Sequence, residues 1–208
     1  MSMTQHVGIF DYGAGNLKSL HNALTYTGAS VSVITKSEPI DHISHLVFPG
    51  VGAFGYCRDQ LAESGMLDLV LDTLERQLVP VLGICVGMQL LADSSTEFGN
   101  SAGLGVCGGV VSKIPATSEE RVPHVGWNEV EFHNAFGGFS TGEKVDFYFD
   151  HSYALTNPKQ ETVLGTTTHS IQFTSLVKTG MVVGAQFHPE KSQNAGLLFL
   201  NSFLNMTE

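Results

Sequence analysis

The chain has 208 residues, enough for one domain with a sizeable hydrophobic core but not for a second large one. Twenty acidic residues against ten basic ones give a formal net charge of −10, which disfavours binding to a nucleic-acid backbone or to an anionic membrane surface. Three cysteines without a Cys-x-x-Cys pair argue against a disulfide framework or a zinc site and favour a reducing compartment.

The first ten residues, MSMTQHVGIF, lack the basic region and the long apolar region of a signal peptide. No stretch approaches the ~20 consecutive apolar residues that span a bilayer. We therefore expect a soluble, cytoplasmic protein without a nucleic-acid or membrane partner.

The first hundred residues alternate between strand and helix patterns. Leu17, Leu20 and Leu24 recur at helical spacing, and Gly28 ends that segment. The patterns predict strands over 6–10, 30–34, 45–50 and 78–84 and helices over 14–28, 56–77 and 86–94. Such alternation is typical of a parallel sheet that helices cover on both faces.

From residue 105 onward the pattern changes to strands joined by turns. The expected strands are 109–114, 128–132, 145–153, 162–168, 171–180 and 181–187, and a helix over 193–205 closes the chain. We expect one domain spanning residues 1–208, with an α/β fold. Its open, largely parallel central sheet should carry helices on both faces and a strand-rich second half.

The segment VLGICVGMQLL, residues 81–91, places a cysteine where an apolar strand turns into a helix. Gly83 and Gly87 flank Cys85 in the pattern Gly-x-Cys-x-Gly, which has the form of a nucleophile elbow with cysteine in place of serine. The N-terminus of the following helix favours the thiolate, which is the nucleophilic form. A buried cysteine that only fills space is the alternative, and the elbow alone does not decide between the two.

A second candidate segment, QFHPEKS, follows the last apolar strand, and sites in open α/β sheets form beyond the carboxyl ends of strands. His188 ends the strand and Pro189 stops its hydrogen-bonding ladder. Glu190 should point to the same side as His188 if the chain stays extended. A carboxylate there would orient the imidazole, so Cys85, His188 and Glu190 together predict a Cys-His-Glu triad, although the His-Glu pair alone favours a solvated strand end.

A thiolate that attacks an acyl carbon needs N–H donors for the oxyanion. The N–H of Val86, directly after the cysteine, is one candidate. The N–H of Val51 is the other, because the glycines in PGVG let a peptide rotate inward. An ordinary glycine turn is the alternative.

Two further signals are weak. DYGAGNLK is similar to a dinucleotide fingerprint, but Lys18 stands at its third glycine position, so we expect no such cofactor. His42 and His45 are three residues apart without a third ligand, which favours a solvated face over a metal site.

The motifs GICVGMQLL and QFHPEKS make the chain resemble the triad-type (class I) glutamine amidotransferases. DYGAGNLKSL, PGVGAF, PHVGWNEV and FYFDHSY extend the resemblance over nearly the whole chain. DYGAGN, PHVGWN and HPEKS narrow it to the glutaminase subunits of imidazole glycerol phosphate synthases. The resemblance implies hydrolysis of L-glutamine to glutamate and ammonia, with Cys85 as nucleophile, His188 as base and Glu190 as the group that orients it. It also implies a heterodimer with a (β/α)₈ synthase subunit, which uses the ammonia to make imidazole glycerol phosphate and aminoimidazole carboxamide ribotide in histidine biosynthesis.

Further roles come only from the resemblance. It implies that the glutamine is held by Gly52, Gln89, Ser152 and Tyr153. It implies that the partner interface is lined by Asn16, Trp127, Tyr148 and Lys191.

The chain departs from the family pattern at two positions. Asp150 replaces the usual apolar residue before His151, and Val125 replaces the usual methionine in PHVGWN. Because of these two departures, the resemblance supports the triad more strongly than it supports the partner contacts.

Three other functions stay open. A paralogous subunit could supply ammonia for the amidination of surface-polysaccharide sugars. A Cys-His-Glu peptidase or γ-glutamyl hydrolase could use the same fold, and release of free ammonia from glutamine would separate it from an amidotransferase. A catalytically silent flavodoxin-like binding module would lack a reactive thiol.

Overall fold

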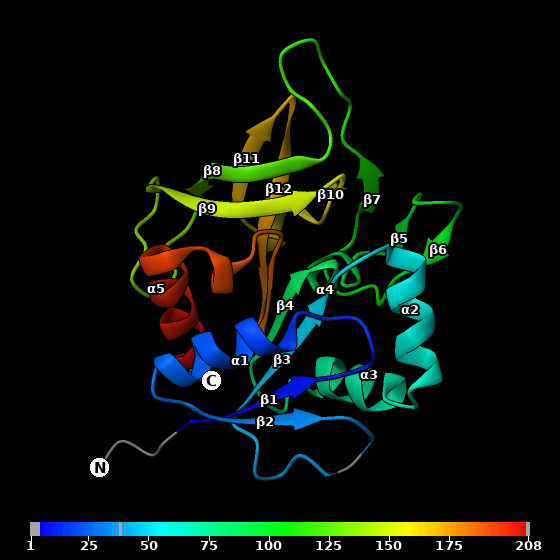
Figure 1. The fold of residues 1–208 in the computed structure, drawn as a ribbon, viewed down its shortest axis with the longest axis vertical. Helices are drawn as coiled ribbons and strands as arrows, with labels where there is room; N and C mark the ends of the chain where they lie inside the picture. Colours follow the sequence, from blue (N-terminus) through cyan, green and yellow to red (C-terminus); the bar gives the residue numbers. More distant parts are fainter. Residues whose placement is uncertain (1–4, 38, 207–208) are drawn as a thin grey trace.

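The computed structural model describes residues 5–37 and 39–206 (Figure 1). Residues 1–4, which begin the stretch compared above with a signal peptide, lie outside this description, as do residues 38, 207 and 208. Within the described residues thirteen strands belong to one sheet. One part of the sheet is parallel and comes mainly from the first half of the chain, and the other part is mainly antiparallel.

Five strands form the parallel part, in the order β2-β1-β3-β4-β13. They are β1 (His6–Phe10), β2 (Ser30–Ile34), β3 (His45–Gly50), β4 (Val81–Cys85) and β13 (Val182–Ala185). The first three confirm the predicted bounds. β3, β4 and β13 are buried along their whole length, as expected for central strands that are covered on both faces.

Helices cover both faces of these strands, as predicted. α1 (Leu17–Tyr26) and α5 (Gln193–Leu204) lie side by side on one face, whereas α2 (Phe54–Glu63) and α3 (Leu67–Arg76) lie on the other (Figure 1). Right-handed crossovers explain the division, because the chain steps in one direction from β1 to β2 and in the opposite direction from β3 to β4.

The second part of the sheet begins at β12 (Ile171–Thr179), which pairs antiparallel with β13. One branch continues through β10 (Tyr153–Thr156), β7 (Val110–Lys113), β5 (Ser94–Ser95) and β6 (Ser101–Ala102). The other runs through β11 (Val163–His169), β8 (His124–Phe132) and β9 (Lys144–His151). A 3₁₀ turn, η1 (Gln160–Thr162), precedes β11. The strand-rich second half is therefore confirmed, although the two-residue strands β5 and β6 were not predicted.

Two predicted elements are each two elements in the structure. The helix predicted over 56–77 breaks between α2 and α3 at Gly65, whose φ of +73° lies outside the helical region. The strand predicted over 145–153 breaks at Ser152, because β9 pairs with β8 whereas β10 pairs with β7 and β12. At Ser152 the chain therefore crosses from one branch of the sheet to the other.

The helix predicted over 86–94 was wrong in its length: α4 (Val86–Gln89) has four residues. The carbonyl groups of residues 90–93 do not accept helical hydrogen bonds. They accept the N–H groups of residues 103–107 instead, at 2.8–3.0 Å. This segment approaches so closely that a Cβ atom on Gly103 would collide with the Ala92 carbonyl. Long-range pairing therefore replaces the helix that local periodicity predicts.

A cluster of buried phenylalanines joins β9, the end of β13 and α5. The ring of Phe187, just after β13, stacks on Phe147 of β9 with centroids 4.0 Å apart, and Phe199 of α5 meets it edge-on at 5.0 Å. Aromatic pairs at these distances stabilise the fold beyond their burial. The cluster holds the segment that directly precedes His188.

Candidate active site

Cys85 lies at the end of β4 in a backbone conformation that L-residues rarely adopt, with φ 54° and ψ −112°. A Cβ atom on Gly83 would lie 2.8 Å from the Gly87 carbonyl oxygen, and one on Gly87 would collide with the Phe48 carbonyl. Both glycines are therefore required by close backbone packing. The predicted sharp turn from strand to helix is confirmed.

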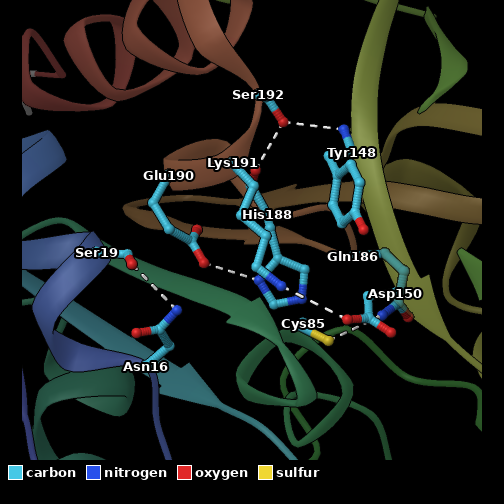
Figure 2. Close-up of polar contacts among 10 residues, drawn as sticks. All are labelled: Asn16, Ser19, Cys85, Tyr148, Asp150, Gln186, His188, Glu190, Lys191 and Ser192. Atoms are coloured by element: carbon cyan, nitrogen blue, oxygen red, sulfur yellow. Dashed lines mark hydrogen bonds and ion pairs between the residues drawn. The ribbon is translucent and has the colours of Figure 1, made fainter. Parts of the chain in front are cut away.

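His188 reaches Cys85 because β13 is the parallel neighbour of β4, with Ala185 beside Ile84. Beyond Ala185 the chain continues alongside the cysteine, and the N–H of His188 donates to the Tyr148 carbonyl at 2.8 Å. Nδ1 of His188 lies 2.9 Å from Oε1 of Glu190, and both side chains are almost fully buried (Figure 2).

The chain does not stay extended from His188 to Glu190, which was the condition for the predicted direction of the Glu190 side chain. Residues Pro189–Lys191 form a 3₁₀ turn, η2, and only His188 keeps an extended conformation. Pro189 is at the first position of this turn, where its fixed φ suits a helix start. The Glu190 side chain then reaches back to the imidazole, so the predicted contact exists through a different backbone geometry.

Cys85 and Glu190 both affect the pKa of the His188 imidazole. Burial lowers the pKa of His188, but hydrogen bonds to Cys85 and Glu190, and the negative charges of these groups, outweigh burial and raise the pKa to about 10. His188 therefore holds a proton at neutral pH. Oε1 of Glu190 contacts the imidazole, whereas Oε2 is buried and has no hydrogen-bond partner among the described residues. The side-chain amide of Gln186 lies 3.7 Å from the Cys85 sulfur.

A cavity of about 300 Å³ opens beside the cysteine. The structure brings together in its wall most of the residues predicted for catalysis, oxyanion binding and substrate binding: Cys85, His188, Val51, Val86, Gly52, Gln89, Ser152 and Tyr153. The predicted oxyanion loop adjoins the elbow because Gly50 is the register partner of Cys85 between β3 and β4. A Cβ atom on Gly50 would lie 2.6 Å from the Gly87 nitrogen, so only glycine fits there.

Glu97 also lines the cavity, and sequence reasoning missed it. One of its carboxylate oxygens accepts the Phe54 N–H at 2.7 Å, at the start of α2. No local motif surrounds Glu97, so only the tertiary contact reveals it. Asp150 and His151 reach the same cavity, and sequence reasoning gave neither of them a role there.

Three of the four residues expected at a partner interface lie together, and one of them, Lys191, lines the cavity. Trp127 and Tyr148 are neighbours on β8 and β9, with ring centroids 6.1 Å apart, and Trp127 is 48% exposed. Nζ of Lys191 lies 5.4 Å from the Tyr148 ring centroid and 3.5 Å from the Asp150 carboxylate. Asn16 lies on the other side of His188 from Tyr148 (Figure 2).

The structure also shows the surroundings of His45, one of the two histidines noted in the sequence. His45 is buried against Phe203, with ring centroids 5.2 Å apart, so the solvated face expected for it is wrong. In residues 5–37 and 39–206 no three His, Cys, Asp or Glu side chains are grouped as a metal site requires. None of the helices in these ranges combines the length and apolar composition needed to cross a membrane.

Residues 8–205 match the family model described as glutamine amidotransferase class-I, so the chain belongs to this class of proteins. Its curated relatives narrow the class. The chain is 42% identical over 205 residues to imidazole glycerol phosphate synthase subunit HisH of Archaeoglobus fulgidus, which covers 97% of this chain and 99% of that protein. Identity to the HisH subunit of Moorella thermoacetica is 40% over 200 residues, with 95% and 93% coverage. The chain therefore belongs to the HisH family.

The chain is also similar to a longer protein and to a solved structure. The chain is 38% identical over 201 residues to the chloroplastic imidazole glycerol phosphate synthase hisHF of Arabidopsis thaliana, of which it covers 34%. The structure of PurLQS from Thermotoga maritima superposes with a TM-score of 0.76 over 98% of this chain and 99% of that chain, at 18% identity. This similarity confirms the α/β fold.

Proposed function

We propose that this chain is the glutaminase subunit of an imidazole glycerol phosphate synthase and that it acts in the cytoplasm as a single domain spanning residues 1–208. The observation that carries the proposal is that Cys85 and His188 line one cavity together with Val51, and that Glu190 is hydrogen-bonded to His188. The HisH names of its relatives support the histidine branch over the sugar-amidinating paralogues.

In the proposed reaction the Cys85 thiolate attacks the amide carbon of glutamine. The N–H groups of Val51 and Val86 bind the resulting oxyanion. The imidazolium of His188 gives its proton to the departing nitrogen, which leaves as ammonia, and a glutamyl thioester remains on the sulfur. Neutral His188 then takes a proton from the water that attacks the thioester, so glutamate is released and the resting protonation is restored. Glu190 holds the imidazole in position and stabilises its charged form.

The cavity suits a free amino acid. Its volume of about 300 Å³ is at the lower end of ligand pockets, which favours glutamine over the extended peptide of a peptidase. Carboxylates of Glu97 and Asp150 and the ammonium of Lys191 surround the space and complement the two charges of an amino-acid head group. Gln89 supports this wall: its Nε2 lies 2.8 Å from the Tyr153 carbonyl and 3.0 Å from Oε1 of Gln186.

The ammonia would pass to a (β/α)₈ synthase subunit that forms a heterodimer with this chain. Two features support such a partner. The Arabidopsis relative carries a matching segment within a much longer synthase chain. In addition, Trp127 is a large exposed aromatic beside Tyr148, and such residues dominate protein interfaces.

The test is to purify the chain with its candidate synthase partner and to measure glutamate and ammonia released from glutamine. A γ-glutamyl peptide supplied in parallel distinguishes a hydrolase, which would cleave it faster than glutamine. Complementation of a histidine-requiring strain that lacks its own glutaminase subunit distinguishes the histidine branch from sugar amidination. Absence of glutamine hydrolysis in the purified complex would refute the proposed function.

A further inference from the structure

We propose that Tyr12 and Cys57 are positioning residues for the oxyanion hole. They hold the carbonyl groups on both sides of the peptide between Gly50 and Val51, so that this one peptide presents its N–H to Cys85. The proposal rests on the proposed glutaminase function and extends it to two side chains behind the loop.

Tyr12 follows β1 and is buried, with its ring tilted against Phe48 at a centroid distance of 5.1 Å. Its hydroxyl donates a short hydrogen bond to the carbonyl of Pro49. A Cβ atom on Gly50 would lie 3.0 Å from this hydroxyl, so Tyr12 supports the loop at Gly50.

Cys57 is fully buried on α2 and lies outside the residues that line the glutamine cavity. Its thiol donates to the carbonyl of Val51, with the sulfur 3.3 Å from the oxygen. Tyr12 and Cys57, from different parts of the chain, therefore bond to carbonyl groups two residues apart on the same loop.

Both groups are suited to act as donors. Burial is the main cause that raises the pKa of Tyr12 well above its ordinary value and that of Cys57 to about 11. Both therefore keep their protons at neutral pH, and each has one proton to give to a carbonyl. The thiol would have no nucleophilic role in this state.

The consequence follows from peptide planarity. The Pro49 carbonyl fixes the plane before Gly50, and the Val51 carbonyl fixes the plane after Val51. The Cα atoms of Gly50 and Val51, at the two ends of the plane between them, are then held in place beside the elbow, and this plane can turn only about the line that joins them. If the hydrogen bond from Tyr12 or the one from Cys57 is lost, the loop can shift as a whole. The Val51 N–H would then be misplaced when the oxyanion forms. Precise placement of such donors is what lowers the barrier.

Because the oxyanion forms only after the thiolate attacks and is absent from bound glutamine, loss of a support should lower kcat and leave KM unchanged. Loss of a whole donor costs about 10²–10³ in rate, so a loosened donor should cost roughly tenfold. The test uses the complex with the synthase partner and the variants Tyr12→Phe, Cys57→Ala and Cys57→Ser. Cys107→Ala is the matched control, because Cys107 is equally buried but its thiol donates to the Gly108 carbonyl, at 3.6 Å, and not to the oxyanion loop.

Tyr12→Phe and Cys57→Ala should each lower kcat for glutamine about tenfold. KM, and synthesis from ammonium salts by the partner, should stay within twofold of wild type. Cys57→Ser should recover most of the rate because a hydroxyl also donates. Rates equal to those of Cys107→Ala would overturn the proposal, as would a KM that rises in step with the fall in kcat. A wild-type complex that is inactive with glutamine would instead refute the proposed function itself.

Discussion

His124 and His151 share a hydrogen bond in the interior: Nδ1 of His124 lies 2.9 Å from Nε2 of His151. Nδ1 of His151 lies 2.9 Å from the Tyr153 carbonyl, and the Asn128 amide nitrogen lies 3.1 Å from Nε2 of His124. Because a carbonyl only accepts, His151 donates from Nδ1 and accepts from His124, which in turn accepts from Asn128. Two neutral imidazoles therefore link β8 to the backbone in the cavity wall.

The first prediction concerns acid stability. Burial is the main cause that lowers the pKa of His124 to about 3 and of His151 to about 4, below the ordinary 6.5. Between about pH 6.5 and 4 the unfolded chain binds more protons, so the free energy of unfolding should fall as the pH falls through this range. Denaturant unfolding at pH 7.5, 6 and 5 measures it. His124→Gln should weaken the dependence, and an unchanged slope would contradict the assignment.

The second prediction concerns alkaline stability and has the opposite sign. The pKa of His188 is raised to about 10, so its interactions stabilise the fold fully below about pH 6.5 and are lost progressively between 6.5 and 10. The free energy of unfolding should decline over this range, and less steeply in His188→Gln. Equal slopes in both proteins would mean that His188 gains no proton-linked stability from Cys85 and Glu190.

The third prediction concerns the nucleophile. A glutamine-like diazo-ketone should label Cys85, which lines the cavity beside His188. It should spare Cys57 and Cys107, because burial raises the pKa of these thiols to about 11 and about 12. Peptide mapping by mass spectrometry identifies the labelled residue. A label on Cys57 or Cys107, or none in the complex, would exclude Cys85 as the nucleophile.

The fourth prediction divides hydrolysis from synthesis. Cys85→Ala should reduce glutamine-dependent synthesis by the complex by roughly 10⁴-fold or more and leave synthesis from ammonium salts unchanged. Glu190→Gln should cause a smaller loss, because this side chain only orients the imidazole. Paired assays with glutamine and with ammonium chloride measure both. If Cys85→Ala also abolished the ammonium-dependent reaction, the two chains would not divide the chemistry in this way.

The fifth prediction concerns the oxyanion loop and the partner. Glycines on both sides of Val51 allow the loop peptide to turn, so the chain alone should be a poor glutaminase that becomes active when the partner and its acceptor are bound. Glutamate release by the chain alone, with partner and with partner plus acceptor measures this. Gly50→Ala should be inactive in all three, because its Cβ would lie 2.6 Å from the Gly87 nitrogen. Equal rates of the wild type in all three would contradict partner control.

Local patterns predicted the elements whose cause is local. The strands over 6–10, 30–34 and 45–50 have their predicted bounds because their apolar runs are set off by glycine, proline or polar residues. The prediction of a helix over 86–94 failed because the carbonyl groups of residues 90–93 pair with the N–H groups of residues 103–107. Periodicity in a short window contains no information about such pairing.

The candidate site likewise contains parts that local sequence patterns predict and parts that only tertiary contacts show. The sequence by itself indicated the elbow around Cys85 from the local pattern Gly-x-Cys-x-Gly, and it identified His188 and Glu190 from their place after the last strand. Gly83 packs against Gly87 within the elbow, whereas the demand for glycine at position 87 comes from the Phe48 carbonyl on β3. Only the tertiary structure decided that β13 lies beside β4, which brings His188 to Cys85 across about a hundred residues. It alone added Glu97 to the cavity and placed Tyr12 and Cys57 behind the oxyanion loop. Glu97 and Tyr12 satisfy backbone groups of distant segments, and the partners of such hydrogen bonds are set by the packing of the whole sheet.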